Sequence, residues 1–218
     1  MISFKKIALI SLLSLSSVCV SAFEEGVDYV KLTAPLENSN GTLAKVFSYD
    51  CPFCFKYDIG VDPRILPRVE KELHLKFKPM HIETKGKYGR VASEFLAMAV
   101  LRDQKAGVSL ESSKSLFKKA KDAIYMAYHK KGERWSSGED AFIKTMTDAT
   151  GIPLDEFNSA RKDPAVLALC DEWKKTYDVA KIQGIPAYVV NGKYLIMTKN
   201  IRGLDPMFEL IKELNSKE

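Results

Sequence analysis

The sequence predicts an α/β fold in which one mixed β-sheet has helices on both faces and is interrupted by an inserted all-helical domain. A strand–helix–strand pattern near the N-terminus, a β-hairpin near the C-terminus and a long helical stretch between them lead to this prediction. Parallel strands joined by a helix, with a hairpin at the other end, fit a single mixed sheet. We expect residues 23–84 and 163–218 to form the sheet domain and residues 85–162 the helical insertion.

Residues 1–22 have the pattern of a secretory signal peptide. Lys5 and Lys6 precede an apolar run over residues 7–20, and a small-residue cleavage pattern ends at Ala22. The apolar run is short for a bilayer, which disfavours the alternative of a membrane anchor. We expect cleavage after Ala22 and export to an oxidising compartment.

Composition narrows the class of protein. The chain has 218 residues, with 33 Lys plus Arg and 28 Asp plus Glu. The signal carries two of the basic residues and no acidic ones, so the mature chain has a net charge of 31 − 28 = +3. This charge is too mild to indicate nucleic acid as a partner, and no later segment is long and apolar enough to cross a membrane. We expect a soluble monomer.

The first half of the expected sheet surrounds two cysteines. Residues 43–49 are apolar and β-prone, and the motif Cys51-Pro52-Phe53-Cys54 follows with its proline suited to the first turn of a helix. Gly60 and Pro63 break or kink that helix, and residues 75–82 predict a second strand.

The middle of the chain predicts helices that end at glycines, which is typical of the position just past a helix. The expected ranges are 91–106, 112–130 and 140–150, the last with Ser137 as N-cap. Asp163-Pro164 opens a long helix to about Ala180.

A hairpin and a final helix close the chain. Residues 187–190 and 194–197 flank Asn191-Gly192, a strong short-range signal for a hairpin. Asp205-Pro206 opens the last helix. We expect the hairpin to complete the sheet.

The C-x-x-C motif carries the chemistry. Its first cysteine sits where unpaired backbone N–H groups and the positive end of the helix dipole favour an anion. A thiolate is both nucleophile and leaving group in disulfide exchange, so its pKa controls rate and equilibrium. Cys54 lies one turn later, where it can close the ring, and we expect it to be the more buried thiol. The motif predicts a redox-active pair.

Two other interpretations of the motif compete. Half a zinc site needs a second C-x-x-C or paired histidines, whereas Cys170 stands alone and the histidines show no ligand spacing. A structural disulfide would enclose only two residues and would stabilise the fold little. We expect no metal and no cofactor beyond the Cys51–Cys54 disulfide itself.

A second element gives the motif a family context. Gly184-Ile185-Pro186-Ala187 beside a C-x-x-C motif resembles the cis-proline loop of thioredoxin-like proteins. Together with Phe47-Ser48-Tyr49-x-Cys51-Pro52-x-Cys54, the helical insertion and the hairpin, it makes the mature chain similar to the DsbA family. Within that family, Pro52-Phe53 and residues 84–88 are most similar to the DsbL branch.

The resemblance implies a thioredoxin fold, an exported thiol:disulfide oxidoreductase and a set of roles. The implied catalytic residues are Cys51 as nucleophile, Cys54 as resolving thiol and Pro186 as cis-proline. The implied substrate-binding residues are Pro52, Phe53 and Ile185.

The same resemblance implies an oxidase of the periplasm that gives its disulfide to reduced client proteins, an arylsulfate sulfotransferase among them. A quinone-coupled membrane protein of the DsbB or DsbI type would reoxidise it. Two alternatives stay open. One is a disulfide reductase or isomerase, and the other is a chaperone-like module that holds clients on the apolar surface around Phe53 and Pro186.

Three positions differ from the family pattern or affect the pKa of Cys51. Phe53 replaces the histidine that DsbA carries between its cysteines, so it provides no cation beside the thiolate. Asp50 is a nearby negative charge that raises the pKa of Cys51. Lys45, where thioredoxin-like proteins often have a buried acid, would lower that pKa if it is buried and charged. Its alternative is a lysine at the strand edge that reaches solvent.

Two further residues have simple structural interpretations. Cys170 shares a helical stripe with Val166 and Trp173, which favours a buried inert thiol over a third redox thiol. His81 ends a predicted strand, and we expect it to be structural.

Overall fold

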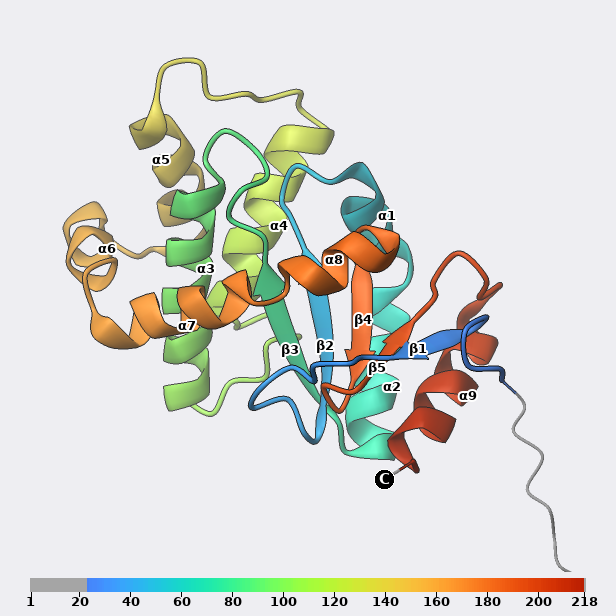
Figure 1. Cartoon of the computed structure of the whole chain (residues 1–218). Coiled ribbons are helices and arrows are strands. Elements are labelled where there is room, and N and C mark those ends of the chain that lie inside the picture. The colour runs from blue at the N-terminus through green and yellow to red at the C-terminus, as the bar shows by residue number, and fades with distance from the viewer. Residues whose placement is uncertain (1–22, 218) are drawn as a thin grey trace, which may run out of the picture.

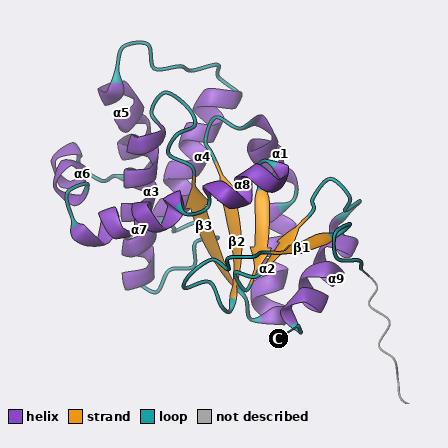
Figure 2. Cartoon of the chain, viewed as in Figure 1, coloured by secondary structure: helices purple, strands orange, loops and turns teal. Residues whose placement is uncertain are grey.

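The computed structural model describes residues 23–217, and it confirms the predicted α/β class with its mixed sheet and helices (Figures 1 and 2). The predicted signal peptide over residues 1–22 lies outside the described residues. The strands are β1 (Tyr29–Lys31), β2 (Thr42–Phe47), β3 (Lys76–His81), β4 (Ala187–Val190) and β5 (Tyr194–Ile196). They lie in the order β1-β5-β4-β2-β3, with β2 and β3 parallel and the other neighbours antiparallel.

Helices cover both faces of this sheet. They are α1 (Pro52–Gly60), α2 (Asp62–Leu73), α3 (Gly89–Lys105), α4 (Leu116–His129), α5 (Glu139–Thr150), α6 (Leu154–Ala160), α7 (Pro164–Lys174), α8 (Tyr177–Gln183) and α9 (Leu204–Asn215). Figure 1 shows α3 to α7 grouped on one side of the sheet, with α8 crossing in front of the strands.

A hydrophobic core lies on each face of the sheet, and side chains along β2 alternate between these two cores. Leu43 packs with apolar side chains of α2 and α9, whereas Ala44 and Val46 pack with those of the helical block. Successive side chains of a strand point to opposite faces, so Lys45 follows Leu43 toward α2. In the sheet, Lys45 lies opposite Tyr188 of β4 and Pro79 of β3.

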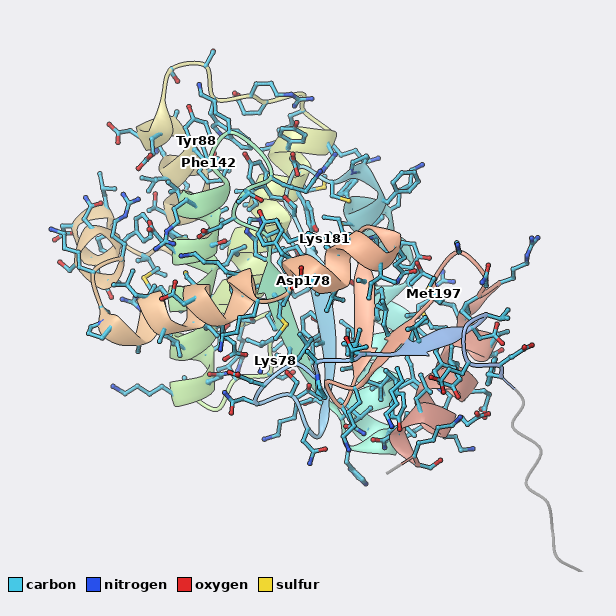
Figure 3. The ribbon with its side chains drawn as sticks, in the orientation of Figure 1. Lys78, Tyr88, Phe142, Asp178, Lys181 and Met197 are labelled. Carbon is cyan, nitrogen blue, oxygen red and sulfur yellow. The ribbon has the colours of Figure 1, made fainter. Side chains whose placement is uncertain are left out.

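Aromatic side chains of the helical insertion pack together in a core that is continuous with one face of the sheet. Tyr88 and Phe142 stack with their ring centroids 5.0 Å apart (Figure 3), and Trp135 packs edge-on against Phe142 at 4.7 Å. Helix α7 also packs against α3. Helices α3 to α6 follow one another between β3 and α7, and the exact domain boundaries at 85 and 162 stay predictions.

Three local expectations were wrong. Helix α4 begins after Ser115, whose hydroxyl accepts a hydrogen bond from the Lys118 N–H at 2.9 Å, and not at Ser112. Gly138, with no side-chain hydrogen bond, is the N-cap of α5 in place of Ser137. The expected long helix to Ala180 is interrupted between α7 and α8. Strand β1 and helix α6 were not predicted, because three and seven residues show too little periodicity.

Among the residues from 23 to 217, we find no helix with the length and apolar character needed to span a membrane.

Candidate active site

The two cysteines of the motif lie at the N-terminus of α1. Cys51 is the N-cap with an extended backbone, and Pro52 occupies the first turn. The backbone N–H of Cys54 donates a hydrogen bond to the Cys51 sulfur at 3.1 Å. Both are free thiols, Cys51 being 5% exposed and Cys54 0%. The structure therefore has the burial order expected for an attacking and a resolving thiol.

The two thiols differ in acidity. Hydrogen bonding from the Cys54 thiol, supported by the backbone N–H groups of Cys54 and Phe53, lowers the pKa of Cys51 from 9.0 to about 7. Burial and the Asp50 carboxylate oppose this shift. Burial raises the pKa of Cys54, as does its hydrogen bond to Cys51, and Lys45 acts in the other direction. Cys51 is therefore the thiol that forms a thiolate near neutral pH.

The loop around Pro186 faces these thiols. The Ile185–Pro186 peptide bond is cis, and the Cys51 thiol donates to the Ile185 carbonyl oxygen at 3.5 Å. Pro186 is buried at the start of β4, and Ile185 is half-buried. The structure thus brings together residues that are more than 130 positions apart in sequence.

A groove of about 470 Å³ opens beside the thiols. It is lined by the first three residues of the motif, by the loop before Pro186 and by helix α8, on which Figure 3 labels Lys181. Phe53 lines this groove and is 62% exposed, an unusual position for a phenylalanine. An apolar wall next to a reactive sulfur suits an extended, partly apolar peptide.

Lys45 is buried, so the alternative of a lysine at the strand edge that reaches solvent is wrong. It is 2% exposed and forms an ion pair with Asp62, and its ammonium lies 3.9 Å from an Asp58 oxygen. Its charge lowers the pKa of Cys54. Asp50 accepts a hydrogen bond from the Ser48 hydroxyl at 2.7 Å.

The sequence analysis missed His129. Its Nε2 donates to the Tyr49 carbonyl oxygen at 2.9 Å, and its ring stacks on Phe55 with centroids 4.9 Å apart. Burial lowers its pKa, so the ring is neutral at neutral pH. It lies 80 residues from Tyr49, and no local pattern marks it.

His81 is structural, as expected. It is buried, accepts from the Tyr49 N–H at 3.2 Å through Nε2, and therefore presents Nδ1–H to the Ser93 hydroxyl at 2.8 Å. Burial lowers the pKa of His81 to about 3. Over the described range, no three His, Cys, Asp or Glu side chains gather as a metal site would require.

Cys170→Ser should leave exchange activity within about twofold of wild type, because the thiol is 1% exposed and burial raises its pKa to about 12. The buried hydroxyl should cost about 1–3 kcal/mol of unfolding free energy. Thermal melts and an insulin-reduction assay measure the two effects. Cys170→Ala is the control that adds no hydroxyl. A large loss of activity at unchanged stability would make Cys170 a working thiol.

Asp50→Asn should lower the pKa of Cys51 further, because this carboxylate opposes thiolate formation. The shift should stay below about one unit, since Asp50 is partly solvated and its charge is screened. The amide oxygen of the asparagine can still accept the hydrogen bond from the Ser48 hydroxyl. The thiolate ultraviolet absorbance as a function of pH measures the change, and Asp148→Asn on the distant α5 is the control. An unchanged or higher pKa would contradict the assignment.

A family model described as DSBA-like thioredoxin domain matches residues 42–215. The chain is 53% identical over 216 residues to the thiol:disulfide interchange protein DsbL of Escherichia coli O6:H1, a match that covers 98% of this chain and 96% of the relative. The similarity therefore spans the sheet domain and the helical insertion.

Solved structures agree. The crystal structure of DsbL from Salmonella enterica serovar Typhimurium is 54% identical, with a TM-score of 0.86, and the match covers 91% of this chain and 100% of that one. A DsbA structure from Klebsiella pneumoniae, at 19% identity and a TM-score of 0.70, covers 91% of this chain and 100% of its own. At that identity the likeness shows a shared fold that includes the helical insertion.

Proposed function

The chain belongs to the family of DSBA-like thioredoxin domains and is a protein disulfide oxidoreductase, and we propose that it works as an oxidase of exported proteins. It transfers the Cys51–Cys54 disulfide to reduced cysteines of its clients. The sequence pattern of residues 1–22 supports export, and the periplasm is the compartment proposed.

The proposed reaction uses the two thiols in different ways. A client thiolate attacks the Cys51 sulfur, the bond to Cys54 breaks, and the electron pair leaves on Cys54. A second client thiolate then attacks the client sulfur of the mixed disulfide and releases the Cys51 thiolate. The client gains one disulfide, and the enzyme keeps both electrons as a dithiol.

The observation that carries the oxidase direction is the position of Cys51 at the N-cap of α1, where hydrogen bonds to its sulfur lower its pKa. A thiolate stabilised by the fold exists only in the reduced enzyme, so it favours reduction of the enzyme's disulfide by clients. A shift from 9.0 to about 7 corresponds to at most about 2.7 kcal/mol at alkaline pH, before solvent screening reduces it. For a two-electron couple this is at most about 60 mV.

Substrate contacts and partners complete the proposal. The Ile185 main chain pairs with an extended client segment beside Pro186, while Pro52 and Phe53 contact its side chains. Clients are reduced exported proteins, with an arylsulfate sulfotransferase as one candidate. A quinone-coupled membrane protein of the DsbB or DsbI type restores the disulfide.

Equilibration with glutathione buffers tests the direction. The measurement uses the Cys170→Ser variant, so that only the Cys51–Cys54 pair titrates. An oxidase should show a potential less negative than about −180 mV, the poise of an oxidising compartment. A value near about −270 mV, as in a reducing thioredoxin, would replace the oxidase by a reductase. N-terminal sequencing of the exported protein should begin at Phe23.

A further inference from the structure

Four charged side chains are buried together beneath the thiols. They come from different elements and form an alternating network: Lys45 on β2, Asp58 on α1, Asp62 on α2 and Lys121 on α4. All are at most 8% exposed. Charges are rarely buried this deeply unless they are paired, and replacing such pairs by apolar residues is often neutral or stabilising. Stability alone therefore does not explain why these charges are buried.

Each cation of this network pairs with an anion. The ammonium of Lys45 pairs with Asp62, whose other oxygen accepts from the Tyr188 hydroxyl. Lys121 pairs with Asp58 and also, at 2.9 Å, with the partly exposed Asp122. The four buried groups of the network are two cations and two anions, and together they carry no net formal charge.

Cys54 borders this network. It is fully buried and precedes Asp58 by four residues on α1, so the two side chains lie on the same face of that helix. The Asp58 carboxylate is 3.9 Å from the Lys45 ammonium. The positive charge of Lys45 lowers the pKa of Cys54.

We propose that Lys45 is a positioning residue for disulfide exchange, and that its ammonium, held by Asp62, stabilises the thiolate that forms on Cys54 as it leaves Cys51. This inference rests on the proposed roles of the two cysteines. In the step concerned, a client thiolate bonds to Cys51, the Cys51–Cys54 bond breaks and Cys54 takes the electron pair. No proton moves in that step, so a negative charge appears on a buried sulfur, and a fixed nearby cation lowers its cost.

Other titratable groups face the same interior. They are Asp58, Asp62, Lys121, Tyr125, Tyr188 and Glu111. Burial raises the pKa of Glu111 to about 7, close to that of Cys51. A pH profile therefore needs Glu111→Gln as a control. Tyr125 has a buried hydroxyl without a hydrogen-bond partner among residues 23–217.

The test follows the step in which Cys54 leaves. Oxidised protein is mixed with excess glutathione at a series of pH values, and the reaction is stopped with acid. Mass spectrometry then measures how fast the mixed disulfide between glutathione and the protein forms. Lys45→Met combined with Asp62→Asn removes the cation and keeps the interior neutral. This double variant should react about tenfold more slowly, because a leaving thiolate of higher pKa departs more slowly.

A second double variant serves as the control and removes the other two charges of the network. Lys121→Met with Asp58→Asn deletes one cation and one anion but retains Lys45 with Asp62, and should react within about twofold of wild type. Lys45→Arg should retain most of the rate. Circular dichroism melts establish that each variant is folded.

Two results would overturn the inference: equal slowing in both double variants, or a wild-type rate without Lys45. Failure of the proposed oxidase function would appear instead in the glutathione equilibrium of the protein with Lys45 intact. The two failures are therefore distinguishable.

Discussion

Cys51→Ser is expected to reduce disulfide exchange to the level of the uncatalysed reaction, whereas Cys54→Ser should trap a mixed disulfide with client proteins. Serine has no acidity near neutral pH to replace a thiol of pKa about 7, so the first variant loses both nucleophile and leaving group. The second retains Cys51, which can still form a mixed disulfide with a client, but lacks the Cys54 thiol that would otherwise attack Cys51 and release the client again. These opposite outcomes follow from placing Cys51 at the N-cap of α1 and Cys54 in its interior.

Oxidation of a reduced two-cysteine peptide measures the loss in Cys51→Ser. Non-reducing gels and mass spectrometry detect the trapped complex of Cys54→Ser. Cys170→Ser serves as the control because it removes a buried thiol away from the motif. If Cys51→Ser trapped clients while Cys54→Ser did not, the assigned roles would be reversed.

The reduced enzyme should gain stability relative to the oxidised enzyme as pH rises from about 6 to 9. The pKa of Cys51 is lowered on folding from 9.0 to about 7. A lowered pKa contributes stability that is fully present above the unfolded value and is lost as pH falls through the folded value. The gain over this window should approach about 2 kcal/mol, less the part screened by solvent.

Above about pH 9 the trend should end, because the pKa of Cys54 is raised on folding and its unfolded thiol then ionises first. Cys170 is a free thiol in both redox forms, so its contribution cancels. Denaturant unfolding of both forms at several pH values measures the difference. A stability difference that does not change with pH would show that folding leaves the acidity of Cys51 unaltered.

Local signals in the sequence determined much of the fold and the centre of the site. Pro52 lies in the first turn of α1, Gly60 is its last residue and Pro63 lies in the first turn of α2. Asn191-Gly192 lies in the turn between β4 and β5. These signals act between residues that are close in the chain, so the sequence alone was sufficient. The C-x-x-C motif at a helix start likewise predicted a redox pair before any tertiary contact was known.

Only the tertiary structure decided what surrounds that pair. The partner of Lys45 lies 17 residues away, the hydroxyl that binds the same carboxylate lies 126 residues from it, and His129 reaches Tyr49 across 80 residues. The sequence alone left two positions open for Lys45, the surface and the interior. Burial, ion pairing and acidity depend on which segments the sheet and the helices bring together, and no local pattern encodes those distances.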